Sequence, residues 1–212
     1  MSRGFYERGW RGVHFEPDPV HAARLRKDRP DEVVHEVALS DEEGTLRFFV
    51  MRNSGNSTGV FEYAEEARRN GSLAGEREVT ATTLKRVCAV LSSTNVHWMK
   101  IDVEGMEEKV LRGWDATMLR PWIVVVEATR PNSTVPHPGL DEILAGNGYQ
   151  FVFFDGLNRY YIADEKADLA SAFSAPVNIF DLMNGCELAA TSPFSRLWIK
   201  CRSLLYEAVA SA

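Results

Sequence analysis

The stretch Trp98-Met99-Lys100-Ile101-Asp102-Val103-Glu104-Gly105 constrains the fold of this chain more than any other segment. A short apolar run ends there in two acids and a glycine, and the apolar residues that follow at helical spacing are Met106, Val110 and Leu111. This pattern predicts a buried strand that runs into a helix. Ligands of open α/β sheets bind at the carboxyl ends of the strands, so Asp102 and Glu104 occupy a position at which chemistry is usually done.

The acids that follow this strand have a simpler interpretation. Glu107 and Glu108 fall in the first turn of the predicted helix, where negative charge interacts favourably with the helix dipole. We therefore expect them to stabilise the helix, which should end at a C-cap on Gly113. Asp102 still lies at the strand end and is the stronger candidate for chemistry.

The first part of the chain predicts a strand, a helix and a second strand. Residues 13–16 form the first strand, and Asp18 followed by Pro19 is a strong helix start that continues until Pro30. Residues 33–39 form the second strand. Such a βαβ unit requires parallel strands joined by a right-handed crossover.

Residues 40–83 form an excursion that we expect to cover the sheet edge. It contains predicted strands at 45–50 and 78–82 and a polar loop at 53–59, and a helix follows at 84–91.

The second half of the chain returns to the sheet. Residues 121–127 form a continuously apolar strand, the kind that a parallel sheet buries on both faces, and this strand also ends in an acid, Glu127. A helix is expected at 139–145. Residues 151–154 and 160–163 then predict two strands joined by a tight turn, as in an antiparallel hairpin.

Composition excludes several classes of function. The net charge of −6 argues against a protein that binds nucleic acid through its phosphates, because that requires a concentrated basic face. The three cysteines show no metal pattern and point to free thiols in a reducing compartment, so we expect a cytoplasmic protein. No apolar run approaches the length of a transmembrane segment. The oligomeric state stays open.

Glu16 is a candidate for cofactor binding. It ends the first predicted strand before a turn into a helix, a position from which a carboxylate accepts hydrogen bonds from both hydroxyls of a ribose. A second turn of this kind follows one crossover later, at Val37-Ala38-Leu39-Ser40-Asp41, where an adenine could lie against small apolar side chains.

Several ordered motifs of the chain resemble the FkbM-type S-adenosylmethionine-dependent methyltransferases. They are Phe15-Glu16-Pro17, Ala38-Leu39-Ser40-Asp41 with Gly44, Lys100 to Gly105 with Glu107 and Val110-Leu111-Arg112-Gly113, Val124 to Glu127, Gly148-Tyr149 and Asp155 to Tyr161. The resemblance covers roughly residues 4 to 182. It implies an α/β, Rossmann-like methyltransferase fold, with a mostly parallel sheet that ends in a C-terminal antiparallel hairpin.

The resemblance also implies an activity and a set of site residues. The activity is methyl transfer from S-adenosylmethionine to a hydroxyl of a sugar or small natural product. Glu16 would hold the cofactor ribose, the segment Ala38, Leu39, Ser40 and Asp41 would border its adenine, and Asp102 with Glu104 would face the methyl group and the acceptor. The domain would span residues 1–185, and residues 186–212 would form an amphipathic C-terminal helix.

One departure from the family pattern affects both fold and cofactor binding. The family normally opens with a strand and a glycine-rich loop of the form Asp-x-Gly-Ala-Asn-x-Gly, and this chain begins after it. The missing first strand would be the middle of the sheet, between the strands that end at Glu16 and Asp102. Either the chain is a truncated form of a longer protein or it has lost ordinary cofactor binding.

An alcohol is a poor nucleophile while it is protonated, so the reaction calls for a base. The candidates are Asp102, Glu104 and His137, the last of which lies in the loop after the strand that ends at Glu127. A divalent ion held by Asp102 and Glu127 could instead lower the pKa of the hydroxyl. No compact ligand motif supports such an ion, and no metal site is predicted.

Two other interpretations compete with an O-methyltransferase. The chain could be a non-catalytic remnant of the fold that serves as an interaction module, with its C-terminal helix as the partner surface. It could also be a nucleotide-dependent oxidoreductase, because Glu16 would serve an NAD ribose equally well. The absence of a Gly-x-Gly-x-x-Gly loop weakens the oxidoreductase most.

Overall fold

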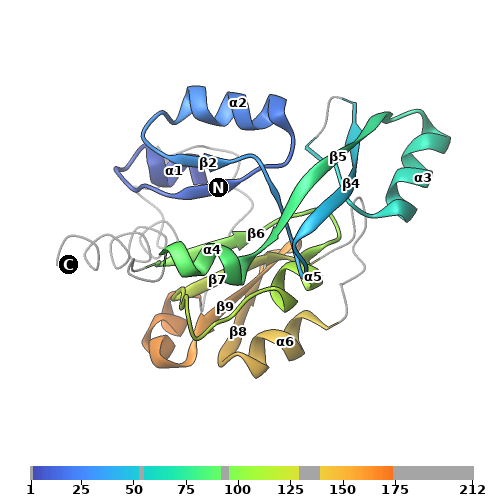
Figure 1. Ribbon diagram of the computed structural model, residues 1–212. Coiled ribbons are helices and arrows are strands. Elements are labelled where there is room, and N and C mark those ends of the chain that lie inside the picture. Colours follow the sequence, from blue (N-terminus) through green and yellow to red (C-terminus); the bar gives the residue numbers. More distant parts are fainter. Residues whose placement is uncertain (1, 53–54, 92–95, 129–138, 174–212) are drawn as a thin grey trace, which may run out of the picture. The chain divides into compact units, whose positions relative to one another are not determined.

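The computed structural model describes residues 2–52, 55–91, 96–128 and 139–173 of the chain (Figure 1). These residues form a mixed α/β structure with parallel and antiparallel strands, consistent with a methyltransferase-like fold. The chain divides into two compact units, Met1–Ser93 with Val103–Leu119 and Thr94–Asp102 with Arg120–Ala212. Among the described residues, no helix is long and apolar enough to cross a membrane. The predicted C-terminal helix within residues 186–212 lies outside the described part of the chain.

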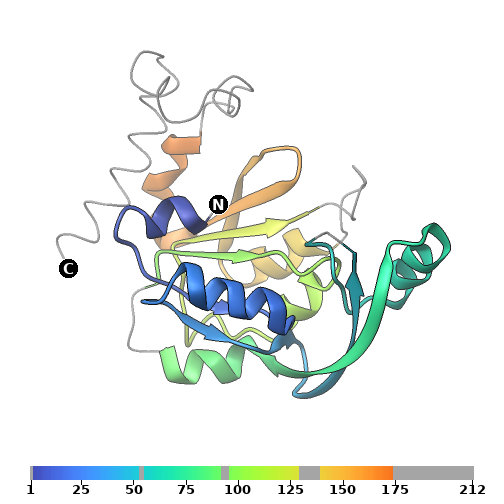
Figure 2. The same ribbon diagram turned by 90° about the horizontal axis from the view of Figure 1, so that it is seen from above.

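The first unit opens with a short helix, α1 (Ser2–Tyr6), and the predicted βαβ unit. Strand β1 (Val13–Phe15) pairs with β2 (Val33–His35) in parallel, and helix α2 (Pro19–Asp28) connects them and lies along the pair (Figure 2). Asp18 caps α2, because its carboxylate accepts hydrogen bonds from the amides of Val20 and His21. The predicted helix start is thereby confirmed.

The second predicted strand, residues 33–39, is in fact two strands. β2 ends at His35, and β3 (Ala38–Ser40) pairs in parallel with β5 (Leu73–Thr83) in a separate three-stranded sheet. The two strands also differ in burial, because Ala38 and Ser40 are buried whereas both ends of β2 are exposed. The prediction was wrong because the partner that stabilises β3 comes from a distant part of the chain.

The excursion is a long antiparallel ribbon that carries a helix. Strand β4 (Gly44–Met51) pairs with β5, and helix α3 (Phe61–Asn70) lies beside this ribbon (Figures 1 and 2). No helix was predicted at α3, and β5 is longer than the strand predicted at 78–82. The unit is completed by two predicted helices, α4 (Leu84–Leu91) and α5 (Glu107–Arg112).

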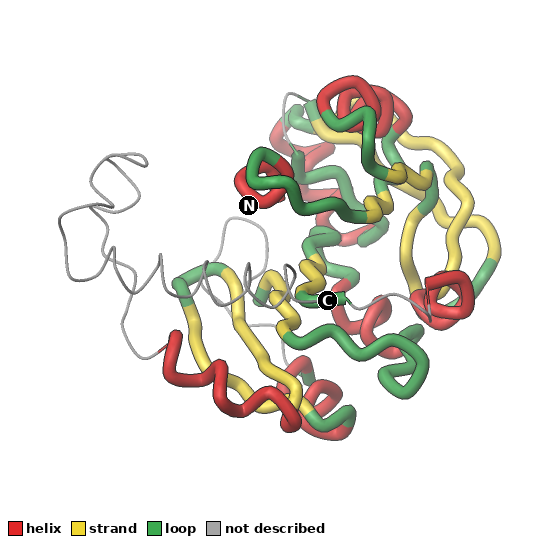
Figure 3. The backbone as a smooth tube through the Cα atoms, turned by 90° about the vertical axis from the view of Figure 1, so that its left-hand side faces the viewer, coloured by secondary structure: helices red, strands yellow, loops and turns green. Residues whose placement is uncertain are grey.

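The second unit is built on a four-stranded sheet in the order β6-β7-β9-β8. Strands β6 (Trp98–Ile101) and β7 (Ile123–Glu127) are parallel, and β7 is buried throughout, as predicted. Strands β8 (Tyr149–Phe154) and β9 (Asn158–Ala163) form the predicted antiparallel hairpin, in which β9 pairs with β7. Helix α6 (Leu140–Gly146) precedes the hairpin, and the 3-10 helix η1 (Asp164–Phe173) lies against it (Figure 3).

Candidate functional site

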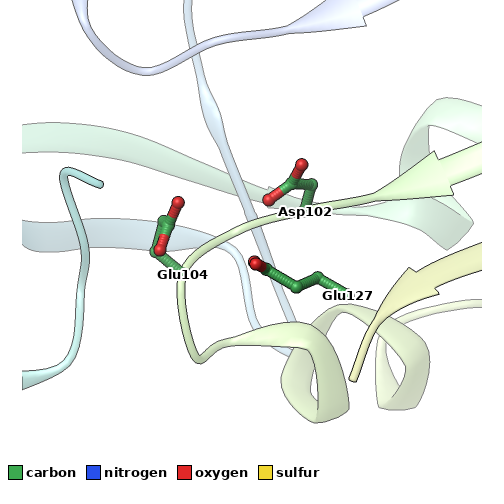
Figure 4. Close-up of side chains that lie close together, drawn as sticks. All are labelled: Asp102, Glu104 and Glu127. Carbon is green, nitrogen blue, oxygen red and sulfur yellow. The ribbon is translucent and has the colours of Figure 1, made fainter. Parts of the chain in front are cut away.

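Two carboxylates lie at the carboxyl ends of the parallel strands of the second unit. Ile101 of β6 is in register with Val126 of β7, so the next residues, Asp102 and Glu127, continue side by side. Glu104 follows Asp102 by two residues. Carboxylate oxygens of Asp102 and Glu127 lie within 4.8 Å of one another (Figure 4). Of the three predicted base candidates, Asp102 therefore lies at this strand end and Glu104 follows it in the chain; the third, His137, lies outside the described residues.

Glu104 sits in a strained turn. Its φ of +52° is the only positive φ of a non-glycine residue in the described part of the chain. The Thr58 hydroxyl donates a hydrogen bond to the Glu104 carbonyl oxygen at 2.6 Å, which holds this conformation from the excursion of the same unit. Backbone strain of this kind costs about 1–3 kcal/mol and persists where the surroundings over-determine it, often at functional sites.

Glu107 lies in the first turn of α5 and also holds the turn at Glu104 through hydrogen bonds. Its side chain is 1% exposed, and its carboxylate accepts hydrogen bonds from the amides of Val103 at 3.0 Å and Gly105 at 3.1 Å. The expectation of a purely electrostatic role at the helix start therefore needs correction, because a buried carboxylate needs specific donors. Glu108 behaves as expected, since it is bound on the surface to Arg112.

Asp102 is held by the next side chain on the same face of its strand. The Lys100 ammonium forms an ion pair with the Asp102 carboxylate. The Asp102 side chain is 41% exposed, so it remains within reach of a ligand from solvent. Lys100 is therefore a cation already present beside the carboxylates.

Asn158 extends the row of polar side chains by one strand. It is the register partner of Glu127 across the antiparallel pair of β7 and β9. The Ala128 amide donates to the Leu157 carbonyl oxygen at 2.9 Å, so Glu127 and Asn158 form a non-hydrogen-bonded pair, in which side chains approach most closely. Asp102, Glu127 and Asn158 thus follow one another across three neighbouring strands.

The Asn158 carboxamide is anchored on one side only. Its Nδ2 donates to Asp155 Oδ2 at 3.1 Å, but its Oδ1 is buried and has no hydrogen-bond donor among the described residues. Desolvation alone would raise the pKa of Asp155, but hydrogen bonds from Asn158, Leu157 and Tyr160 lower it below its usual value. An ionised Asp155 fixes the orientation of the amide, because the reverse would set oxygen against oxygen.

Glu16 follows β1 in the first unit, at the strand end where it was predicted. Its Oε1 accepts a hydrogen bond from the Asp18 amide at 2.9 Å, whereas Oε2 has no donor among the described residues. Burial raises the pKa of the Glu16 carboxyl, and the hydrogen bond from the Asp18 amide opposes this effect. The carboxylate is held in place with one oxygen left to accept bonds from a ligand.

The segment Ala38–Asp41 is packed tightly against helix α5. Ala38 and Ser40 are buried, and the Ser40 hydroxyl donates to Asp41 Oδ1 at 2.9 Å. A Cβ atom on Gly113 would lie only 2.2 Å from the Ser40 carbonyl oxygen. Gly113 does cap α5, but its φ is −80°, so the close approach to Ser40, and not a left-handed conformation, requires the glycine.

The sequence did not predict Glu127 or Asn158 as a catalytic or cofactor-binding residue. Because Glu127 ends a strand as Asp102 does, it was considered only as a ligand, with Asp102, of a divalent ion. The sequence around Asn158 does not mark it as a site residue. Its place beside Glu127 follows from a strand pairing that the local sequence does not encode.

Comparison with known proteins identifies the family. The family described as "Methyltransferase FkbM domain" matches residues 1–151, which is well over half of the chain. Searches of curated proteins and of solved structures found no match. The matched region includes the strand ends that carry Glu16, Asp102 and Glu127 as well as the strained turn at Glu104. The chain therefore belongs to the FkbM methyltransferase family.

Proposed function

We propose that this protein is an S-adenosylmethionine-dependent O-methyltransferase that acts on a hydroxyl of a sugar or small natural product. The observation that carries the proposal is the pair of carboxylates, Asp102 and Glu127, at the ends of two parallel strands in a chain of a methyltransferase family. Carboxyl ends of parallel strands are where α/β enzymes hold their ligands.

The residues of the first unit fit the ribose and adenine of the cofactor. Glu16 offers a held carboxylate with an uncommitted oxygen, which suits the two hydroxyls of a ribose. Ala38 and Ser40 are buried, whereas Leu39 is half-buried and Asp41 is exposed, so Leu39 would offer the apolar contact to a flat heterocycle beside Asp41. S-adenosylmethionine supplies an electrophilic methyl group when bound.

Asp102 or Glu104 would act as the base. The carboxylate would accept the proton of the acceptor hydroxyl, and such a base contributes roughly 10²–10⁴ in rate. The strained turn at Glu104 is held by Thr58 and Glu107, so the backbone that carries this carboxylate has a fixed position. Fixed positioning reduces the entropy that the reaction must lose.

We also propose that the sheet is Rossmann-like. A Rossmann-like sheet would contain one more parallel strand, which carries the glycine-rich loop of the family. Among the described strands, β1 pairs only with β2 and β6 pairs only with β7, so each has an edge that such a strand could use. These unpaired edges support the expectation of a missing first strand.

We expect the 212-residue chain to bind S-adenosylmethionine or S-adenosylhomocysteine. Glu16→Ala should weaken that binding roughly 10- to 100-fold, because hydrogen bonds to a charged group contribute about 1.5–3 kcal/mol. Calorimetric titration measures both affinities. Glu66→Ala, which removes an exposed acid from α3, is the matched control and should bind as the wild type does. No binding by a folded wild-type chain at millimolar cofactor would instead favour a non-catalytic interaction module.

The affinity should also depend on pH through Glu16. Only the ionised carboxylate accepts hydrogen bonds from both ribose hydroxyls, and burial raises the pKa of this group. Cofactor affinity should therefore be complete above the raised pKa and be lost as the pH falls through it, with a midpoint above that of an ordinary glutamate. Titrations at a series of pH values that extends from neutral to below the ordinary glutamate pKa test this. Glu16→Gln should bind weakly without that dependence, and identical pH profiles for the two proteins would contradict the assignment.

A further inference from the structure

We propose that Asp102, Glu127 and Asn158 bind a hard divalent cation at the carboxyl end of the β6-β7-β9 strands. All three belong to the second unit, and strand register alone places them in one row. The site would hold the ion through oxygen atoms only, which is the ligand set that Ca²⁺, Mn²⁺ and Mg²⁺ prefer.

The independent observation is the buried oxygen of Asn158. The residue is 6% exposed, and its Oδ1 has no donor among the described residues. A buried acceptor without a partner has lost its hydrogen bonds to water and gained none in return, which is unfavourable. The bond from Nδ2 to Asp155 turns Oδ1 away from that carboxylate, and the nearest cross-strand neighbour of the side chain is Glu127. A carboxamide oxygen beside a carboxylate lacks any attraction to it unless a positive charge or a donor lies between them.

The two carboxylates are close enough to share one ion. Oxygens of Asp102 and Glu127 lie within 4.8 Å of one another (Figure 4). Two ligands on opposite sides of Ca²⁺ are separated by about 4.6–5.2 Å and those of Mg²⁺ by about 4.0–4.2 Å, since each is twice the metal–oxygen distance. The two acids are thus close enough to bind one hard divalent cation between them.

Lys100 offsets part of the negative charge of Asp102 and Glu127 when no ion is bound. Its ammonium is paired with Asp102, so one positive charge lies beside the carboxylates of Asp102 and Glu127. An incoming cation would compete with Lys100 for Asp102. This competition predicts that removing the ammonium raises the affinity for the metal.

The use of such an ion in catalysis rests on the proposed function. A divalent cation beside the acceptor lowers the pKa of a bound hydroxyl, which reduces the demand on a carboxylate base. Binding of the ion itself can be measured without cofactor or acceptor, so the two proposals can fail separately.

The test is titration of the full chain with Mn²⁺ alone, followed by electron paramagnetic resonance of the free ion. We expect one saturable site in the wild type. Glu127→Gln and Asn158→Ala should each weaken it at least tenfold, and Lys100→Met should tighten it severalfold. Glu142→Gln, which removes an exposed acid from α6 of the same unit, should leave the affinity unchanged.

The outcomes separate the alternatives. No saturable binding at millimolar Mn²⁺ by a chain shown to be folded by circular dichroism would overturn the proposal. Binding that Asn158→Ala leaves intact, or that Glu142→Gln weakens equally, would also overturn it, because the ion would then sit on exposed acids. A chain that binds Mn²⁺ as expected but fails to bind S-adenosylmethionine would refute the proposed function and leave the cation site standing.

Discussion

Replacing Gly105 by alanine should lower the free energy of unfolding by about 3 kcal/mol, because two penalties of about 1–3 kcal/mol each act together. Gly105 has a φ of +100°, which a residue with a Cβ atom rarely adopts. The new methyl group would also lie 2.4 Å from Tyr63 Cε2 and 3.1 Å from Val60 Cγ2. Since Gly105 donates its amide to Glu107, any shift of the turn also disturbs that buried carboxylate.

Urea denaturation followed by tryptophan fluorescence measures this effect. In a chain of this length, a loss of about 3 kcal/mol corresponds to a fall of about 6–12 °C in melting temperature. Gly75→Ala is the matched control, because this glycine of β5 lacks a left-handed φ and an added Cβ atom would meet no described atom within 4 Å. The control should be neutral or slightly stabilising, and equal stability of the two variants would refute the strain at Gly105.

Replacing Gly113 by alanine should have a comparable effect through a different cause. Its φ of −80° suits any residue, so the backbone conformation carries no penalty. The Cβ atom, however, would lie 2.2 Å from the Ser40 carbonyl oxygen and 3.1 Å from the Asp41 Cα atom. These are backbone atoms that cannot rotate away, so β3 and α5 must move apart, at a cost of about 1–3 kcal/mol or more.

This second variant also reports on the proposed adenine segment. If Ala38–Asp41 borders the cofactor, displacement of Ser40 should weaken S-adenosylhomocysteine binding in calorimetry as well as lower the melting temperature. Gly146→Ala provides the comparison, since this glycine ends α6 and an added Cβ atom would meet no described atom within 4 Å. Gly146→Ala should keep full affinity and gain up to about 1 kcal/mol from its better helix propensity. Unchanged stability of Gly113→Ala would show that the contact with Ser40 is looser than the structure has it.

Much of the second unit follows from local sequence pattern. The continuous apolar run of β7 is typical of a strand buried on both faces, and the tight turn Asp155-Gly156-Leu157-Asn158 predicts the hairpin of β8 and β9. In the first unit, Asp18 with Pro19 predicts the start of α2. Each of these features depends on hydrogen bonds or burial within a few residues, which is why a single sequence suffices to find them.

Two features of the first unit were predicted incorrectly or not at all. Residues 33–39 were predicted as one strand, yet they divide between two sheets because β3 pairs with β5. Helix α3 lacks a side-chain cap hydrogen bond at its start, and its clearest mark is Gly71, which ends it in a left-handed conformation. That mark is local and could have been recognised from the sequence.

The candidate site likewise combines features that the local sequence predicts with features that only the folded chain shows. The order of residues was enough to show that Glu16 and Asp102 end strands, because apolar runs that stop at an acid mark the edge of a buried sheet. The folded chain was needed to show that Glu107 is buried under the turn at Glu104, that Gly113 meets Ser40, and that Asn158 stands beside Glu127. These three contacts depend on close packing or on strand register, which are set by the fit of whole elements and not by the residues on either side.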